Sequence, residues 1–225
     1  MINVVCVYYG IKYSLDYVQV LYNMVQRHLT VPHKFICFSD HVKPQKLLKG
    51  DITFRKFKHH DYYGWWNKLQ LFSEEAHLTG TCLYLDLDIV ILDNIDEIAT
   101  FGDDMTFGVI NDFNPNTKEF NSSVMKFNND VATKAIWSKF LEKKAKLMEL
   151  QGDQNVMSKL IKGNVNLKVM PDEWTFSYKW YSRTDPRFGK TRWTFEKKQN
   201  AKIAVFHGSP RPHESEQKWV QKEWN

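Results

Sequence analysis

Two aspartates, Asp86 and Asp88, lie one residue apart within the apolar segment 81–92. Residues i and i+2 of an extended chain point to the same face, so both carboxylates can converge on one divalent cation. Such a cation, with coordination positions left open, is suited to bridging diphosphate oxygens. The alternative is a turn with two solvated carboxylates, since about one Asp-x-Asp is expected by chance among 15 aspartates. Because burial of a carboxylate without a cation is costly, the apolar context favours a metal site.

Three basic side chains are candidates to complete such a site. His207 follows the apolar run 203–206, and a neutral imidazole beside two carboxylates suits Mn²⁺ or Mg²⁺. Taken alone, a histidine in this position is more often structural. Lys68 and Arg211 would offset the charge of a diphosphate as a nucleotide departs. Lys68 is equally consistent with an ordinary exposed helix residue.

Further candidates lie where expected elements begin or end. Tyr8, Tyr9 and Gly10 form a turn after the first apolar run, where α/β sheets place their ligands. An aromatic ring there could stack on a nucleobase, and a core tyrosine is equally consistent. Asp153 is a good helix N-cap and can contact a sugar at the same time.

Aromatic residues gather in two places. Trp65 and Trp66 could stack on a sugar or pack in the core, and the core is favoured for Trp66. The second cluster consists of Trp174, Phe176, Tyr178, Trp180 and Tyr181. Part of it could line an acceptor groove, because aromatic faces suit sugar rings. It runs into the basic segment 179–202, which carries a formal charge of +6 and leaves −1 for the rest of the chain. That segment can concentrate an anionic ligand, or it is a solvated basic surface.

The elements expected to position these residues alternate along the chain. Short apolar runs predict strands at 2–8, 34–39, 81–87, 90–92, 105–110, 124–127, 166–170 and 202–206. Helices are expected at 14–29, capped by Ser14, and at 65–76, 129–150 and 153–161, with an Asn-rich loop at 111–121. The first strand, helix and strand read as a βαβ unit, which predicts a parallel sheet there. No repeat, low-complexity tract or linker divides the chain, so one α/β domain is expected.

The composition agrees with this expectation. The 225 residues are 43% hydrophobic and 15% aromatic, which excludes a disordered chain. No run approaches the roughly 18 apolar residues of a membrane helix, and the N-terminus lacks the features of a signal peptide, so we expect a cytoplasmic protein. The acidic segment 86–104 argues against a nucleic-acid groove.

Cys6, Cys37 and Cys82 are odd in number and far apart, which favours buried free thiols over disulfides or a zinc site.

Five segments, in order, carry a resemblance to a known family. Residues 84–97 (YLDLDIVILDNIDE) resemble the metal-binding DxD strand of GT-A nucleotide-sugar glycosyltransferases. They are especially similar to the retaining, family 8-like group that includes glycogenin and the bacterial lipopolysaccharide galactosyltransferases. Residues 67–69 (NKL) resemble that group's cation-bearing helix, and 120–125 (FNSSVM) its F-N-S-G-V-M segment along the donor sugar. Residues 152–154 (GDQ) match its aspartate–glutamine pair beside the anomeric carbon, and 206–212 (FHGSPRP) resemble its C-terminal H-x-x-G-x-x-K-P motif.

The resemblance implies a GT-A, Rossmann-like single domain over residues 1–225, with a mixed, mainly parallel central sheet flanked by helices. About 1–110 would form the nucleotide-binding half and about 111–225 the acceptor-binding half. Asp86, Asp88 and His207 would hold Mn²⁺ or Mg²⁺, while Asp153 and Gln154 would be catalytic. The candidate donor-binding residues are Tyr8, Tyr9, Gly10, Lys68, Asp86, Leu87, Asp88, Asn121, Ser122, Ser123, His207, Gly208 and Arg211.

The chain departs from the family pattern in the last motif and in the sugar segment. The last motif is two residues shorter between His207 and Gly208, and Arg211 stands where lysine is usual. Arginine can still clamp a diphosphate, and it does so bidentately. Ser123 replaces a glycine, which changes the surface offered to the sugar.

The expected function is metal-dependent transfer of a hexose or deoxyhexose from a UDP-sugar to a hydroxyl of a glycan, a lipid-linked sugar or a glycoprotein. The resemblance implies retention of the anomeric configuration, by front-face attack or through a transient covalent species. One alternative is nucleotidyl transfer, for which residues 9–12 are a poor glycine-rich basic loop. Another is a non-catalytic nucleotide-sugar or carbohydrate-binding module, against which the intact acidic pair argues. No nucleic acid and no membrane-spanning segment are expected, and peripheral membrane contact stays open.

Overall fold

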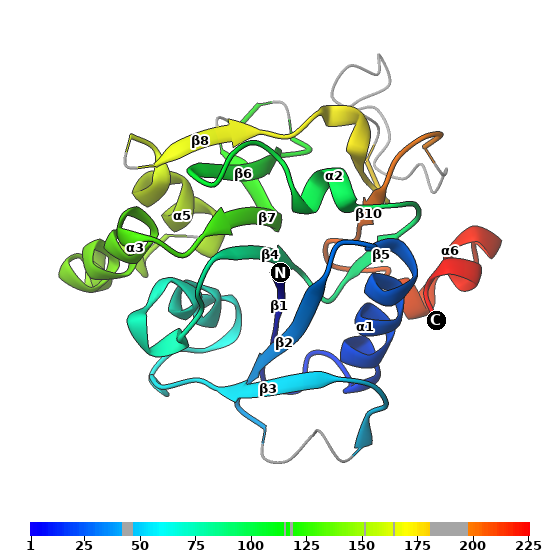
Figure 1. The fold of residues 1–225 in the computed structure, drawn as a ribbon, viewed down its shortest axis with the longest axis horizontal. Coiled ribbons are helices and arrows are strands. Elements are labelled where there is room, and N and C mark those ends of the chain that lie inside the picture. The colour runs from blue at the N-terminus through cyan, green and yellow to red at the C-terminus, as the bar shows by residue number, and fades with distance from the viewer. Residues whose placement is uncertain (42–46, 115, 118, 151, 164, 181–197) are drawn as a thin grey trace.

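A computed structural model describes the chain except for residues 42–46, 115, 118, 151, 164 and 181–197. Within the described part, the main sheet has seven strands in the order β3-β2-β1-β4-β7-β6-β8 (Figure 1). The strands are β1 (Ile2–Tyr8), β2 (His33–Ser39), β3 (Ile52–Lys56), β4 (Thr81–Leu85), β6 (Thr106–Asn111), β7 (Phe120–Asn128) and β8 (Asn166–Val169). β7 pairs antiparallel with both of its neighbours and the other pairings are parallel, so the sheet is mixed and mainly parallel, as predicted.

The first three strands of the chain form the parallel side of the sheet. β1, α1 (Asp16–His28) and β2 are the predicted βαβ unit, and α1 buries its apolar stripe, including Val18 and Leu21. α1 begins after Leu15 and not at the predicted cap, and the Ser14 hydroxyl donates to the Asp16 carboxylate at 3.3 Å. β3 is not predicted from the sequence, because its residues ITFRK are only partly buried and end in two cations.

One edge of the sheet collects the candidate residues. Because β4 is parallel to β1 and antiparallel to β7, the ends of β1, β4 and β6 meet the beginning of β7 at the same edge. β4 ends two residues before the predicted end, so Asp86 and Asp88 lie in the turn to β5 (Ile89–Ile91). β7 begins at residue 120, not 124, because its first residues pair with the end of β6. Asn121 therefore belongs to a strand and not to the predicted Asn-rich loop, and Ser122 follows it in the same strand.

A second, three-stranded sheet ties the C-terminal motif to the acidic turn. β10 (Ile203–Val205) pairs antiparallel with β5 and parallel with β9 (Thr175–Ser177). After β10 ends, the Phe206 amide donates to the Asp88 carbonyl at 2.9 Å. The predicted strand at 202–206 is thus confirmed, and its partner β5 places it beside Asp88, whereas β9 lies inside the aromatic cluster and is not predicted as a strand.

Helices cover both faces of the main sheet (Figure 1). α3 (Val131–Glu142), α5 (Asp153–Ile161) and the 3₁₀ helix η2 (Gly64–Phe72) share one hydrophobic cluster, while α1 and the second sheet share the other. The predicted helix 65–76 is two 3₁₀ helices, η2 and η3 (Glu74–Ala76), because Ser73 is extended between them. The predicted helix 129–150 breaks at Lys143, whose φ is −121°, into α3 and α4 (Lys144–Leu147). The smaller elements are α2 (Asp96–Ala99), η4 (Asp172–Trp174), η5 (Pro212–Glu214) and α6 (Lys218–Glu223).

The three cysteines are buried in the strands and are free thiols, as predicted. Among the helices of the described residues, none is long and apolar enough to cross a membrane.

Candidate active site

The acidic pair lies at the end of β4, and each carboxylate has a tyrosine partner. Asp86 Oδ1 accepts a hydrogen bond of 2.5 Å from the Tyr84 hydroxyl, and the Asp86 amide donates to the Ser123 carbonyl at 2.9 Å. Asp88 is 9% exposed, and its Oδ2 accepts a hydrogen bond of 2.6 Å from the Tyr13 hydroxyl. The turn therefore holds both carboxylates in place with groups from β4, β7 and the loop after β1.

Burial makes the charge of Asp88 costly. Desolvation, together with the negative charge of Asp86, raises the pKa of Asp88 to about 6, although the hydrogen bond from Tyr13 opposes the shift. A cation between the two carboxylates would remove this electrostatic cost. The observed environment therefore fits the predicted affinity for a divalent ion.

Lys68 is the centre of a buried polar network. Its Nζ lies 2.9 Å from Asp153 Oδ2, 3.1 Å from Asp86 Oδ1 and 3.1 Å from Ser122 Oγ. Burial alone would lower the pKa of the Lys68 ammonium, but the carboxylates of Asp153 and Asp86 raise it above its usual value. At 5% exposure, Lys68 is not an ordinary surface residue of a helix. It joins η2 to the acidic turn and to α5.

The predicted catalytic pair begins α5. Gly152 is the N-cap, so Asp153 is the first helical residue and not the cap that its residue type suggests. Its carboxylate accepts a hydrogen bond of 3.0 Å from Ser122 Oγ and faces Lys68, which explains why it does not cap the helix. The neighbouring Gln154 donates through Nε2 to Asp112 Oδ2. Asp112 follows β6 and is not among the predicted site residues, because no local motif surrounds it.

His207 follows β10 in an aromatic setting. Its Nε2 is 2.7 Å from Ser177 Oγ, its ring stacks on Phe113 with centroids 6.1 Å apart, and Trp180 meets it edge-on at 5.0 Å. Burial and the charge of Lys179 lower the pKa of His207 to about 4, so the imidazole is neutral at neutral pH. A neutral imidazole is the form that binds a metal ion.

The three predicted metal ligands are not assembled into one cluster. Within the part of the chain that the structure describes, no three His, Cys, Asp or Glu side chains are grouped closely enough to hold a metal ion. The structure brings Asp88 and His207 together through their backbones, because Phe206 bonds to Asp88, but the His207 ring contacts Ser177. The chemistry of the donor set fits Mn²⁺ or Mg²⁺, and the three-residue ligand set stays a prediction.

Arg211 reaches the acidic turn through Tyr13. Its Nη1 donates to the Lys12 carbonyl at 2.7 Å, and its guanidinium lies 5.3 Å from the centre of the Tyr13 ring. The Lys12 ammonium lies 4.7 Å from the centre of the same ring. Because the Tyr13 hydroxyl bonds to Asp88, one aromatic side chain links two cations to the acidic pair. The only sequence signal for Tyr13 is its place in the loop after the first strand.

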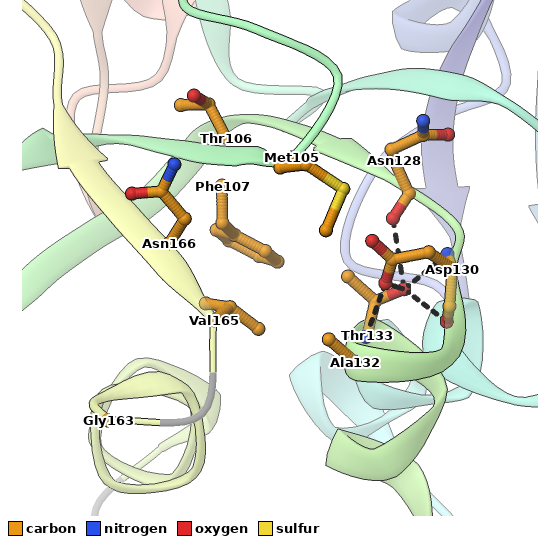
Figure 2. Close-up of a pocket in the computed structure, with 10 residues that line it drawn as sticks. All are labelled: Met105, Thr106, Phe107, Asn128, Asp130, Ala132, Thr133, Gly163, Val165 and Asn166. Carbon is orange, nitrogen blue, oxygen red and sulfur yellow. Dashed lines mark hydrogen bonds between the residues drawn. The ribbon is translucent and has the colours of Figure 1, made fainter.

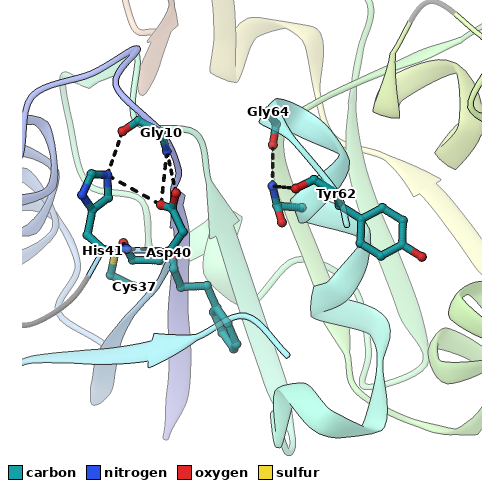
Figure 3. A network of polar contacts seen from close by, with 9 residues as sticks. Gly10, Cys37, Asp40, His41, Tyr62 and Gly64 are labelled. Carbon is teal, nitrogen blue, oxygen red and sulfur yellow. Dashed lines mark hydrogen bonds and ion pairs between the residues drawn. The ribbon is translucent and has the colours of Figure 1, made fainter. Parts of the chain in front are cut away.

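The turn after β1 is fixed by contacts with the end of β2 (Figure 3). The Gly10 amide donates to Asp40 Oδ1 at 3.2 Å, and His41 Nε2 lies 2.7 Å from the Gly10 carbonyl. The φ of Gly10 is +64°, which favours glycine there. Tyr8 is 6% exposed and its ring stacks on His41 at 4.5 Å, so the packing role fits it better than a free nucleobase platform. Tyr9 is partly buried and meets Phe57 edge-on.

The remaining donor candidates are placed by β4, β7 and the segment after β10. Leu87, Ser122 and Ser123 are buried, and Asn121 Oδ1 accepts a hydrogen bond of 2.9 Å from the Ser123 amide. A Cβ on Gly208 would meet Lys179 Nζ at 3.3 Å, so this glycine allows the lysine to approach the backbone.

Only some of the predicted aromatic residues and of the basic segment 179–202 lie among the described residues. Trp66 is 2% exposed, which confirms its core role, and Phe176 and Tyr178 are also buried. Tyr181 and most of the basic segment 179–202 lie outside the described residues. Of its described lysines, Lys202 forms an ion pair with Glu97, at 2.7 Å, away from the acidic turn.

A pocket of about 370 Å³ opens at the opposite edge of the main sheet (Figure 2). It is lined by the beginnings of β6 and β8 and by the end of β7. Asp130 is the one ionisable residue among the described residues that line it, and its carboxylate is engaged as the cap of α3, where it accepts from the Thr133 amide at 2.9 Å. The candidate active site is therefore the group of residues around Asp86 and Asp88 at the other edge of the sheet, and not this pocket.

Comparisons with known proteins agree with this geometry. A family model described as nucleotide-diphospho-sugar transferase matches residues 32–209. No curated protein sequence matches significantly. An active-site mutant of LgtC has a similar structure, with a TM-score of 0.68 and 15% identity over 98% of this chain and 93% of that one. The structure of the galactosyltransferase LgtC in complex with donor and acceptor sugar analogs has a TM-score of 0.65 and 16% identity, over 93% of this chain and 88% of that one. The glycosyltransferase GlyE from Streptococcus pneumoniae TIGR4 gives 0.66 and 14%, over 99% of this chain and 63% of that one. These likenesses confirm the predicted GT-A fold.

Proposed function

Because the chain belongs to the nucleotide-diphospho-sugar transferase family and is therefore a glycosyltransferase with a nucleotide-sugar donor, we propose that its donor is a UDP-sugar. The sugar is a hexose or deoxyhexose and goes to a hydroxyl group of a glycan, a lipid-linked sugar or a glycoprotein. The anomeric configuration is retained.

One observation carries the proposal: a single buried cation, Lys68, lies between a carboxylate of the acidic turn and the carboxylate of Asp153. The distances are 3.1 Å to Asp86 and 2.9 Å to Asp153. Transfer from a diphospho-sugar needs charge stabilisation at the leaving diphosphate and a polar group near the anomeric carbon. Lys68 joins Asp86, on the proposed diphosphate side, to Asp153, on the proposed sugar side, within one polar network.

The leaving diphosphate is met by groups from three parts of the chain. Asp86 and Asp88, with His207, would hold Mn²⁺ or Mg²⁺, which neutralises diphosphate charge when bound. Arg211 presents a planar cation next to Tyr13, and Lys68 holds the carboxylate of Asp86 in position. These contacts support a site in which negative charge that develops on the departing nucleotide is offset on more than one side.

Asp153 and Gln154 are proposed to lie beside the anomeric carbon. Asp153 is fixed by Lys68 and Ser122, and Gln154 by Asp112, so both side chains are held before a donor binds. Prior fixation of this kind lowers the reorganisation needed in the transition state. Residues of about 1–110 are proposed to bind the nucleotide and those of about 111–225 the acceptor.

A donor screen tests the proposal. With Mn²⁺ present, we expect the protein to release UDP from at least one UDP-hexose or UDP-deoxyhexose, and to release little ADP or GDP from the corresponding ADP- and GDP-sugars. The measurement is nucleotide release, with the anomeric configuration of the product determined by NMR. Binding of UDP-sugars without any turnover across donors and acceptors would instead support a non-catalytic binding module. Release of pyrophosphate from a nucleoside triphosphate would support nucleotidyl transfer.

A further inference from the structure

Trp65 is a large aromatic residue exposed beside the candidate active site. It is the second residue of η2 and 52% of its surface is exposed, whereas the adjacent Trp66 is 2% exposed. Tyr63, two residues earlier, is 62% exposed. Tryptophan is highly buried on average, so the exposure of Trp65 is unusual.

The geometry of η2 places Trp65 at the rim of the polar network. Side chains at i and i+3 of a 3₁₀ helix eclipse one another, so Trp65 lies on the same face as Lys68. Lys68 in turn contacts Asp153 at 2.9 Å. From the other side, the Trp65 indole Nε1 lies 3.7 Å from the position that a Cβ on Gly152 would take, and Gly152 caps the helix that begins with Asp153. The indole therefore lies beside the N-terminus of α5, on the face of η2 that carries Lys68.

We propose that Trp65 is the platform on which a pyranose ring of the acceptor stacks. This inference rests on the proposed transferase function and deepens it by naming the acceptor class, a glycan with a pyranose at its accepting end. One face of a pyranose presents C–H groups, which complement the electron-rich face of an indole ring. The half of the chain expected to bind the nucleotide thus contributes an acceptor contact.

Kinetics with three variants test the platform. Donor hydrolysis, measured as UDP release without acceptor, needs no acceptor site, so Trp65→Ala should keep it within about twofold of the wild type. With lactose or a methyl hexopyranoside as acceptor, the same variant should need about tenfold more acceptor for half-maximal stimulation of UDP release. In Trp65→Phe the acceptor concentration needed should rise much less, because an aromatic face remains. Met105→Ala is the matched control, because Met105 is 65% exposed at the opposite edge of the sheet. An unchanged acceptor requirement in Trp65→Ala, or an equal loss of hydrolysis, would overturn the inference.

A titration that needs no turnover separates this inference from the proposed function. The indole N–H signal of Trp65 is identified in a ¹⁵N spectrum by its absence from Trp65→Phe. We expect lactose and methyl hexopyranosides to shift this signal, and sorbitol, which has no ring, to leave it unchanged. A signal that no pyranoside moves, or that UDP alone moves, would show that Trp65 is not an acceptor platform. Failure of every UDP-sugar to turn over would refute the proposed UDP-sugar donor, and the titration would still decide the role of Trp65.

Discussion

Asp88→Asn is expected to lower Mn²⁺-dependent UDP-sugar turnover by about three orders of magnitude, because one carboxylate of the metal site is removed. The size of Asn is nearly the same, and its amide oxygen can still accept the hydrogen bond that the Tyr13 hydroxyl now gives to Asp88 at 2.6 Å. The loss should therefore come from charge and not from a change of shape. Steady-state UDP release at saturating Mn²⁺ measures it.

The same variant should fold at least as well as the wild type in the absence of metal. Burial and the nearby charge of Asp86 disfavour an ionised Asp88, so its replacement by a neutral amide removes an electrostatic cost. Urea unfolding with chelator present measures this. Asp51→Asn is the control for the substitution itself, because Asp51 is exposed just before β3, at the far edge of the sheet. Wild-type turnover in Asp88→Asn would contradict the metal role.

Lys68→Met should both reduce activity by about a hundredfold or more and destabilise the fold by about 3 kcal/mol. Methionine keeps the apolar stem but leaves the carboxylates of Asp86 and Asp153 without the cation between them. Removal of one partner from a buried ion pair is costly because the remaining charge is uncompensated. Urea unfolding followed by tryptophan fluorescence gives the free energy, and UDP release gives the activity.

Two further variants separate stability from chemistry at this position. Asp153→Asn in the Lys68→Met background should recover part of the lost stability, because one uncompensated carboxylate is gone, yet activity should stay low. Lys144→Met is the control: its ion pair with Asp61 is largely solvent-exposed, so the loss should stay under about 1 kcal/mol. If Lys68→Met lost no more stability than Lys144→Met, the central role of Lys68 in the network would be wrong.

The parts of the fold that could be predicted are those in which local pattern and burial agree. Val18, Leu21 and Val25 recur at helical spacing, and all three are buried in α1. β3 could not be predicted, because its Arg55 and Lys56 interrupt the apolar pattern of a strand that pairs on only one side. Helix type also escaped prediction for η2, since an amphipathic pattern does not distinguish a 3₁₀ helix from an α-helix over such a short length.

In the candidate site too, residues within a local motif could be predicted and contacts between distant segments could not. Asp86 and Asp88 could be found from their spacing within an apolar segment. The family resemblance assigned Lys68 and Asp153 to one site, but the contact between them joins residues far apart in sequence and was not predicted. Tyr13 was missed because its hydroxyl acts on a residue 75 positions away. Such contacts depend on how strands are ordered in the sheet, and no local pattern specifies that order.

Binding of UDP with and without Mn²⁺ tests the central claim most directly. Calorimetry of the wild type should show UDP binding in Mn²⁺ that falls at least about tenfold in chelator, and Asp88→Asn should bind UDP weakly under both conditions. Equal affinity of the wild type for UDP with Mn²⁺ and with chelator would contradict a metal-bridged diphosphate at the acidic turn.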